Sequence, residues 1–442
     1  MVGTMTAREA LLASLDELPM NLRPPGDVEA AVRAAAERLT SPRALEVILT
    51  LLGAATSFWS KPPQTPLRFP RDHAFHPGCG PEWYWLTANM DVAGTAGAET
   101  IAFVMSMERQ QPISPDVLAR SGWTEAESQF LFSYACVIHT TPEGSRVYAR
   151  QPNLVWPPMG GITEMGGDPF VIRCGPDILA GSVNVMPLSV LIADTARADP
   201  LIIDVTCTTD MPVESAFFLQ GEDGVTPEPR PGTYYSWPQL AVSGSVTIGG
   251  QTHQVSGKGW LDHEMMYGEV PPLHPLVPPP ARWSAPPGIL GWTFGDFNFA
   301  NGDAMVVAGF QVGPLLTELP AIYGFYLTVE DGRWKKTAVE GVIGLGALMP
   351  LTAQCMMPVS WSCALVADGP PFELTVEAKP WYVDGSFMSA NLSVQGETPV
   401  GLTLSWLGAS EIIPGVGYCE SVGYEPPATY MARALAFLAA SP

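Results

Sequence analysis

The chain has 442 residues, of which 47% are hydrophobic and only 15% are charged, and its formal net charge is −22. This length exceeds what one hydrophobic core usually serves, so we predict two domains. Because basic residues are scarce, the composition argues against nucleic acid and anionic membrane surfaces as partners.

The sequence carries no sign of export or membrane insertion. Its first residues, MVGTMTAREALLASLDELPMN, lack a basic segment ahead of an apolar run, and the most apolar later stretch, residues 44–59, contains Glu46 and is too short to span a bilayer. The seven cysteines are widely spread without a CxxC pair, which is typical of free thiols in a reducing compartment. We therefore predict a cytoplasmic protein, either a monomer or a homodimer.

Residues 1–68 are predicted to form a helical N-terminal extension. Within them VEAAVRAAAERL, residues 28–39, is rich in strong helix formers. From about Phe69 the pattern changes to short runs rich in Val, Thr, Tyr, Phe and Trp, separated by Gly, Pro, Asn and Asp, which is typical of β-strands.

Two β domains are predicted over residues 69–269 and 289–442. Between them, residues 270–288 contain too many prolines for a sheet and are expected to form a stiff linker. Many short strands with little helix between them predict a mainly β fold, in which antiparallel sheets close as barrels or sandwiches. We expect the two domains to pack along a broad apolar interface and to enclose a cavity between or within them.

Two β-hairpins can be placed from their turns. Gly249-Gly250 separates SGSVTI from QTHQVSG, and Asn301-Gly302 separates FNFA from DAMVV. Both dipeptides favour the tight turns that join antiparallel strands.

The segment GKGWLDHEMMYG, residues 257–268, concentrates acidic and aromatic side chains in one strand of the first hairpin. If residue 248 faces residue 251, the cross-strand pairs are Trp237 with Asp262, Tyr235 with Glu264, and Gln239 with Trp260. These residues then share one face, whereas Leu261 and His263 point to the other. A β-bulge near Pro238 would break this register. Because Asp262 and His263 diverge, the strand by itself predicts no metal site.

Carboxylates surrounded by aromatic rings favour a pocket wall, where burial would raise their pKa. The alternative for Asp262 and Glu264 is a partly solvated strand end with buried neighbours. The stretch EWYWLTANM, residues 82–90, supplies a second cluster, for which core packing is the alternative. Its alternation puts Glu82 and Tyr84 on one face and Trp83, Trp85, Thr87 and Asn89 on the other.

The motifs of several large enzyme classes are missing from the sequence. No GxSxG, HExxH, P-loop or dinucleotide-binding glycine pattern occurs in a strand-turn-helix context, and no Cys/His pair has metal-ligand spacing. We therefore expect neither a metal nor an organic cofactor.

Five motifs follow one another along the chain: EWYWLTANM, YYSWPQLAVSGSVTIGGQTHQVSGKGWLDHE, GWTFGDFNFANGDAMVV, PVSW (358–361) and GVGYCESVGY (415–424). Together they resemble the carotenoid 1,2-hydratase (hydroxyneurosporene synthase) and AttH-like family, over roughly residues 70–425. The resemblance implies two lipocalin-like antiparallel β-barrel or sandwich domains.

The resemblance leaves two reactions open, because one fold serves many chemistries. It implies either a polyene hydratase that protonates an alkene, or an intramolecular Diels–Alder cyclase of a polyketide pathway that binds a linear polyene between the domains. In the hydratases the acid is the Asp of the Leu-Asp-His-Glu motif, which is Asp262 here. Met265 and Met266 then follow where the family usually has Trp, and NLSVQG (391–396) replaces a Tyr-Trp-Glu element. The lost ring would remove π stabilisation of a cation and so favours the cyclase.

We therefore predict a cofactor-independent cyclase of natural-product biosynthesis, a [4+2] pericyclase acting on a linear polyene polyketide in an apolar pocket at the domain interface. The predicted polarising acids are Asp262, Glu264 and Glu82. The predicted substrate-binding residues are Trp83, Trp85, Asn89, Tyr235, Trp237, Trp260, Met265 and Trp292. The alternatives are a hydratase or isomerase in which neutral Asp262 protonates an alkene, and a carrier that leaves its apolar ligand unchanged.

Overall fold

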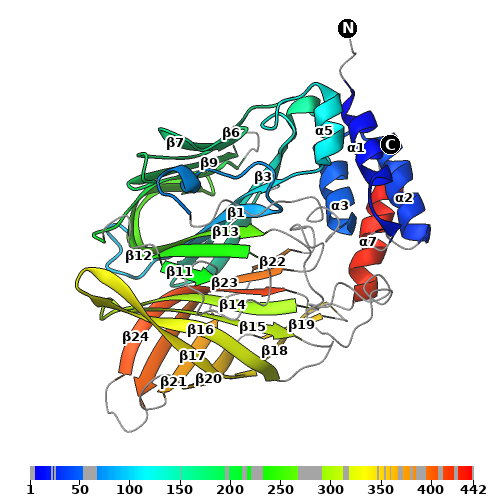
Figure 1. The fold of residues 1–442 in the computed structure, drawn as a ribbon. Helices are drawn as coiled ribbons and strands as arrows, with labels where there is room; N and C mark the ends of the chain where they lie inside the picture. The colour runs from blue at the N-terminus through cyan, green and yellow to red at the C-terminus, as the bar shows by residue number, and fades with distance from the viewer. Residues whose placement is uncertain are drawn as a thin grey trace.

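Two large curled antiparallel sheets, stacked one above the other in Figure 1, form most of the molecule, with helices gathered at one side. This arrangement confirms the predicted mainly β fold with a helical N-terminus. The computed structural model describes residues 5–20, 23, 26–52, 67–150, 152–194, 199–211, 217–220, 232–266, 291–311, 318–345, 348–352, 355–358, 360–366, 372–378, 382–384, 395–406, 412–422 and 427–440. The predicted linker, residues 270–288, lies outside these ranges, so the domain boundaries stay a prediction.

The N-terminal sheet is built mostly from hairpins, and its last strand returns to pair with its first. The strand order is β4-β3-β2-β1-β13-β12-β10-β9-β8-β7-β6, with β5 paired to β3 and β11 to β12. The strands are β1 (Glu82–Val92), β2 (Thr100–Gln110), β3 (Phe130–Thr141), β4 (Gly144–Ala149), β5 (Asn153–Val155), β6 (Thr163–Met165), β7 (Phe170–Cys174), β8 (Asp177–Gly181), β9 (Leu188–Asp194), β10 (Leu201–Thr208), β11 (Phe217–Gln220), β12 (Gly232–Ile248) and β13 (Gln251–Met266).

The C-terminal sheet repeats this plan, with its first strand beside its last. Its order is β21-β20-β17-β16-β15-β14-β24-β23-β22, β21 also pairs with β23, and β18 pairs with β19 separately. The strands are β14 (Gly291–Phe299), β15 (Ala304–Gln311), β16 (Glu318–Glu330), β17 (Arg333–Leu345), β18 (Leu348–Thr352), β19 (Cys355–Pro358), β20 (Ser360–Val366), β21 (Phe372–Ala378), β22 (Tyr382–Asp384), β23 (Gln395–Trp406) and β24 (Ile412–Val422).

The helical layer joins both ends of the chain (Figure 1). It consists of α1 (Ala7–Asp16), α2 (Gly26–Glu37), α3 (Pro42–Leu52), α5 (Pro115–Ser121) and α7 (Pro427–Ala440), while η2 (Arg71–His73) and η3 (Pro157–Met159) are short 3-10 turns. Thr6 begins α1 through a capping box with Glu9. The helices share a hydrophobic cluster with outward side chains of β2 and β3, such as Val104 and Phe132. Among the described residues, no helix has the length and apolarity needed to cross a bilayer.

Strands β1, β2 and β3 are buried on both faces, unlike the strands farther along the sheet. In β10, buried and more exposed residues alternate, as expected where one face meets the core and the other meets water. In β2 every residue after Thr100 is buried, because one face meets the core of the N-terminal sheet and the other is covered. Most polar side chains on β1 and β2 are therefore buried on either face, and Asp91 near the end of β1 is an exposed exception.

The β12–β13 hairpin forms about the predicted Gly249-Gly250 turn, where both residues have positive φ. The predicted register holds as far as the pair of Leu240 with Gly259. Beyond it a bulge at Pro238 and Gln239 shifts the pairing by one residue, and Gln239 itself has a φ of 57°. The second predicted hairpin also forms, with β14 and β15 joined around Asn301-Gly302.

The two sheets pack through β1, β12 and β13 on one side and β14, β15 and β16 on the other. The centre of the contact is an apolar cluster of Tyr234, Trp260, Ala304, Val306, Phe325 and Leu327. Polar ties flank it: the Thr87 hydroxyl donates to the Asp296 carboxyl group (3.1 Å), and Asn89 Nδ2 donates to the carbonyl of Gly417 (3.0 Å). The expected apolar interface is therefore present, with hydrogen bonds along one edge.

Candidate functional site

The paired strands β1 and β13 present two chemically different faces. Trp85 pairs with Asp262, and Trp83 pairs with Glu264. Because side chains alternate along a strand, these residues share one face with Trp260, which packs against the C-terminal sheet, and we call this side the inter-sheet face. On the same face Trp83 and Trp85 pack in the cluster formed with the helices. The other side, here the core face, points into the N-terminal sheet's own core and carries Glu82, Tyr84, Leu261, His263 and Met265.

The predicted site residues divide between these two faces. On the inter-sheet face lie Trp83, Trp85, Asn89, Trp260, Asp262 and Glu264, and on the core face lie Glu82, Tyr235, Trp237 and Met265. The side chain of Trp292 is outside the described part of the chain.

The prediction that Tyr235 and Trp237 face the two acids is wrong, because the bulge rotates them to the other side. Tyr235 pairs with His263 and Trp237 with Leu261. Tyr234 and Ser236, which the sequence analysis did not select, take their places beside Glu264 and Asp262.

Asp262 is a buried acid held by neutral hydrogen-bond donors. Its side chain is 2% exposed. The Trp260 indole donates to Oδ1 (2.6 Å), and the Ser236 hydroxyl donates to the same oxygen. Burial raises the pKa of Asp262 to about 7, although hydrogen bonds from Ser236, Tyr234 and Trp260 act in the opposite direction. Because Ser236 and Trp260 both donate to Oδ1, that oxygen serves as an acceptor.

A second acid, Asp296, approaches Asp262 from β14 of the other sheet. Burial, reinforced by the negative charge of Asp262, raises the pKa of Asp296 well above its ordinary value, while the Thr87 hydroxyl stabilises the charged form. Two acids in one apolar setting disfavour simultaneous ionisation, so burial and the neighbouring charge both favour the protonated form of Asp296.

Three glutamates extend this group across the sheet toward the helices. Glu108 on β2 and Glu264 on β13 flank Trp83 in neighbouring strands. Burial raises the pKa of Glu108 well above its usual range, and Glu46, Glu420 and Glu264 add like charge. We call Glu108, Asp262, Glu264, Asp296 and Glu420 the inter-sheet acids.

This group is partly open to solvent and is covered at one end by α3. Trp83, Glu264 and Glu420 are half-buried, in contrast to Asp262 and Asp296. Glu46 on α3 is buried beside Arg43, and burial raises its pKa to about 7 despite that cation. Trp83, Glu264 and Glu420 are therefore the members of this region that lie nearest to solvent.

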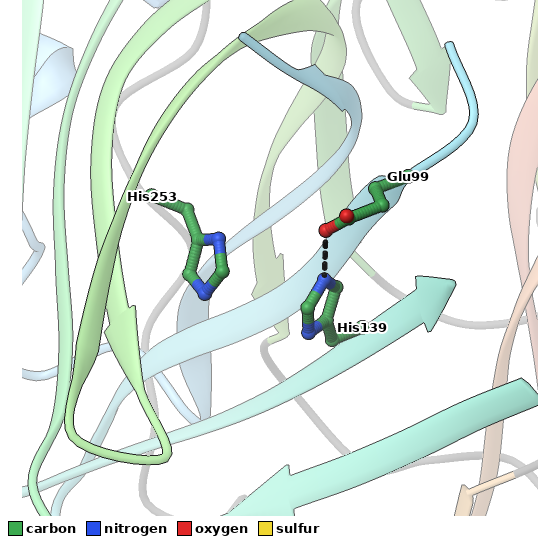
Figure 2. Close-up of side chains that lie close together, drawn as sticks. All are labelled: Glu99, His139 and His253. Atoms are coloured by element: carbon green, nitrogen blue, oxygen red, sulfur yellow. Dashed lines mark hydrogen bonds and ion pairs between the residues drawn. The ribbon is translucent and has the colours of Figure 1, made fainter. Parts of the chain in front are cut away.

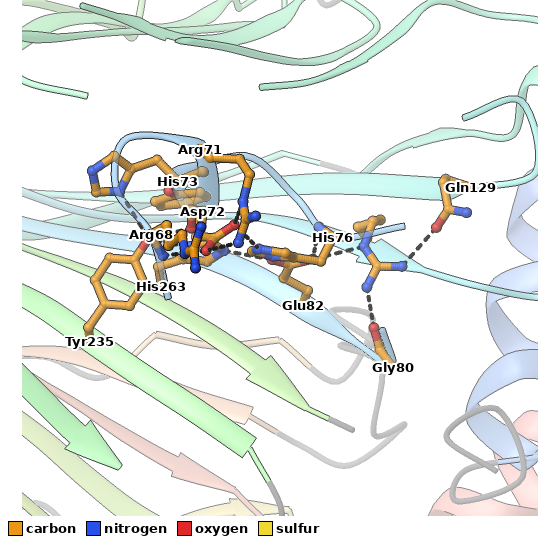
Figure 3. Close-up of polar contacts among 12 residues, drawn as sticks. Arg68, Arg71, Asp72, His73, His76, Gly80, Glu82, Gln129, Tyr235 and His263 are labelled. Carbon is orange, nitrogen blue, oxygen red and sulfur yellow. Dashed lines mark hydrogen bonds and ion pairs between the residues drawn. The ribbon is translucent and has the colours of Figure 1, made fainter. Parts of the chain in front are cut away.

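On the core face, Glu82 is the centre of an ionic network (Figure 3). Its carboxylate is 0% exposed and contacts the ring nitrogens of His76 (2.7 Å) and His263 (2.9 Å) and Nε of Arg109 (3.1 Å). Burial alone would raise the pKa of Glu82, but His76, His263 and Arg109 outweigh it and hold the pKa far below its ordinary value. Glu82 is therefore a permanent anion.

The network continues from His263 to Tyr235, whose hydroxyl lies 2.6 Å from His263 Nδ1 and 3.1 Å from His73 Nδ1 (Figure 3). The Tyr84 hydroxyl donates to the carbonyl of His73 (2.7 Å). These bonds fasten the loop that carries η2 over the end of the N-terminal sheet. The core-face residues thus hold structure, whereas the inter-sheet acids include buried carboxyl groups whose pKa is raised.

Sequence reasoning missed Glu108, Asp296 and Glu420 in the first group, and His76 and Arg109 in the second. A signal for the first three was present, because each is a single acid within a strand of a chain that uses few charges. The partners of Glu82 carried no comparable signal, since they come from a loop and from β2.

Neither group presents an arrangement of metal ligands. In the described part of the chain, one set of His and carboxylate side chains has ligand atoms that converge: Glu99, His139 and His253, at the other end of β13. This set lies apart from the inter-sheet acids.

Residues 60–273 match the model of the AttH-like family. The match covers slightly less than half of the chain and shows a similarity of this segment to that family. It includes the whole N-terminal sheet, with Glu108, Asp262 and Glu264, whereas Asp296 and Glu420 lie beyond it. No curated protein matches the sequence significantly.

Solved structures resemble the whole fold and extend past the AttH-like segment. A crystal structure of an AttH-type protein from Nitrosomonas europaea is 18% identical, covers 83% of this chain and 99% of its own, and has a TM-score of 0.58. Kievitone hydratase from Nectria haematococca is 11% identical over 83% of this chain and 97% of its own, with a TM-score of 0.42. CghA with Sch210972 is 12% identical over 78% of this chain and 89% of its own, with a TM-score of 0.46. The first of these likenesses shows that the AttH-type fold spans both sheets.

Proposed function

We propose that this AttH-like chain is a cofactor-independent cyclase that binds a linear polyene polyketide between its two sheets and catalyses an intramolecular [4+2] reaction. The observation that carries the proposal is the burial of Asp262 beside Trp85, Trp260 and Asp296, which raises the pKa of this acid to about 7. An acid kept neutral near pH 7 donates a hydrogen bond to a carbonyl group without placing a charge in an apolar site.

In this proposal the neutral acids polarise the substrate and the aromatic rings shape it. A hydrogen bond from Oδ2 of Asp262 to a carbonyl conjugated with the reacting alkene withdraws electron density and lowers the barrier. Trp83, Trp85 and Trp260 hold the chain folded with diene and alkene in contact. Such positioning removes several kcal/mol of the barrier, up to about 7–11 kcal/mol in the best intramolecular systems.

A carrier without catalytic activity explains the inter-sheet acids poorly. Burying a carboxyl group disfavours its charged form, and a binding site for an apolar ligand needs no such group. The grouping of Asp262, Asp296 and Glu108 therefore favours an enzyme.

A second candidate is a hydratase or isomerase, and the pKa of Asp262 favours it specifically. A group that titrates near pH 7 both donates and recovers a proton during turnover, as a general acid must. Protonation of an alkene would leave Asp262 as a buried anion, and burial disfavours that charged form, which opposes the step. We therefore rank the hydratase or isomerase second to the cyclase.

The test uses the full chain with synthetic linear polyenes that carry a conjugated diene and a carbonyl-activated alkene, incubated in D₂O. The cyclase predicts a product of unchanged mass that retains no carbon-bound solvent deuterium, whereas the hydratase predicts a gain of one molecule of water. Recovery of the unchanged polyene, with quenched tryptophan fluorescence, would support the carrier. The reaction should persist after dialysis against EDTA.

Variants separate the two enzyme candidates. Asp262→Asn keeps a hydrogen-bond donor, so cyclisation should fall by about 10²–10³ at most and remain measurable, whereas a hydratase should lose nearly all turnover. Trp83→Ala should reduce cyclisation at least as strongly, because the substrate relaxes from its reactive fold. The matched control is Asp91→Asn, an exposed acid at the far end of β1, which should leave the rate unchanged.

A further inference from the structure

Glu99, His139 and His253 come together at the end of the N-terminal sheet that is remote from the inter-sheet acids (Figure 2). Glu99 lies in the connection between β1 and β2, His139 lies near the end of β3, and His253 lies near the start of β13. All three side chains are half-buried. They therefore combine a fixed position with access from solvent.

The curl of the sheet brings these residues together. Strands β3 and β13 are separated by β2 and β1, and three strand spacings in a flat sheet amount to about 14 Å. The rings of His139 and His253 nevertheless lie 4.8 Å apart between centroids, and Nε2 of His139 is 3.2 Å from Oε2 of Glu99. One potential ligand atom from each residue lies within 4.8 Å of the others.

This donor set suits zinc in both chemistry and spacing. Two imidazoles with one carboxylate form a nitrogen and oxygen set that binds zinc readily. Ligand atoms about 2.0–2.1 Å from a tetrahedral ion are about 3.3 Å apart. The pair His139 and Glu99 already has that separation, and His253 needs only a small movement toward them.

We propose that Glu99, His139 and His253 bind one zinc ion, with water completing its coordination. The ion would join the β1–β2 connection, the end of β3 and the β12–β13 hairpin, which are otherwise linked through backbone ladders. Sequence spacing gave no hint of this site, because its ligands are 40 and 114 residues apart, from 139 minus 99 and 253 minus 139.

The proposed zinc site is independent of the proposed reaction. His253 and Asp262 are nine residues apart on β13, about 30 Å along an extended strand. They also point to opposite faces, because His253 is an even number of residues from the core-face residues Leu261 and His263, and Asp262 is an odd number from them. Zinc binding and polyene cyclisation can therefore succeed or fail separately.

The test is a zinc titration of the untagged full chain after removal of metals with a chelator. Calorimetry and metal analysis after gel filtration should give about one zinc per chain. Glu99→Gln, His139→Gln and His253→Gln should each weaken zinc binding at least tenfold, because each removes one of three ligands. Glu143→Gln is the matched control, since this exposed acid lies in the neighbouring β3–β4 turn, and it should bind zinc as the native chain does.

A cobalt(II) titration gives a second measurement that does not depend on affinity alone. Visible absorption bands of low-symmetry cobalt should develop to one equivalent and be lost in His139→Gln and His253→Gln. Circular dichroism checks that each variant remains folded. Zinc bound at far less than one equivalent, or bound equally by folded His139→Gln, His253→Gln and the native chain, would overturn the proposal.

Discussion

Glu82 and Asp262 lie on opposite faces of the same strand pair and are buried to almost the same degree, 0% and 2% exposed. Around Glu82 are Arg109 and two histidines, and its pKa falls far below the ordinary value. Around Asp262 are a hydroxyl, an indole and other carboxyl groups, and its pKa rises to about 7. Burial therefore does not determine the charge of an acid; the partners on its face of the sheet do.

The two acids should give the folding free energy opposite dependences on pH. The folded pKa of Glu82 is lowered, so its stabilisation is present above the unfolded value and is lost as the pH falls. The folded pKa of Asp262 is raised, so its contribution is greatest below the unfolded value of 3.8 and declines as the pH rises to about 7.

The largest effect is expected from Glu82→Gln, which leaves Arg109 and two histidines without their carboxylate. The free energy of unfolding at pH 7 should fall by about 3–5 kcal/mol, measured by denaturant titration. The control is Glu164→Gln in the solvent-exposed pair with Arg173, where about 0–1 kcal/mol is expected. Equal losses of unfolding free energy in Glu82→Gln and Glu164→Gln would contradict a stabilising role for the buried ionic network on the core face.

Asp262→Asn should have the opposite effect on stability. The amide preserves the shape and accepts the same donors without the buried charge that the native chain carries above pH 7. From the folded pKa of about 7 and the unfolded value of 3.8, the gain at pH 8 should approach about 4 kcal/mol and vanish near pH 4. Denaturant titrations across this range measure it, with the exposed Asp204→Asn as the control. A gain independent of pH would show that Asp262 is charged throughout.

A smaller effect is expected from Trp260→Phe, which sharpens the comparison by removing one donor from Asp262. The indole hydrogen bond stabilises the carboxylate, so its loss should raise the pKa of Asp262 further, by about one unit or 1.4 kcal/mol. Carbon-13 NMR of labelled aspartate carboxyl groups follows this titration. An unchanged or lower pKa would mean that the indole does not bond the charged acid.

The fold was predictable from sequence because its signals are local. The Gly249-Gly250 and Asn301-Gly302 turns and the alternating strands can each be recognised from a few neighbouring residues. The faces of β12 were not predictable for the residues before Gln239, because nothing in the chemistry of Gln239 requires the positive φ that creates the bulge. A single shifted residue exchanges every later side chain between faces.

The membership of each acid group was also beyond the sequence. Asp262 could be selected from its aromatic neighbours, but Asp296 and Glu420 join the group from the other sheet, which depends on how two distant segments pack. Glu82 was selected as an acid for catalysis by the same local pattern, and only the cations at His76 and Arg109 distinguish it. Electrostatic surroundings are a property of the assembled structure.

The hydrogen bonds between the two sheets lie at a fixed distance along β1 from Trp83. Thr87, Asn89 and Gln239 all reach residues of the C-terminal sheet, at one level of the interface, whereas the half-buried Trp83 lies four residues earlier on β1. In the proposed reaction, a linear substrate that lay along β1 from Trp83 would cover about 13 Å before it reached these residues. On that proposal, chain length as well as functional groups would select the segment that lies against Asp262.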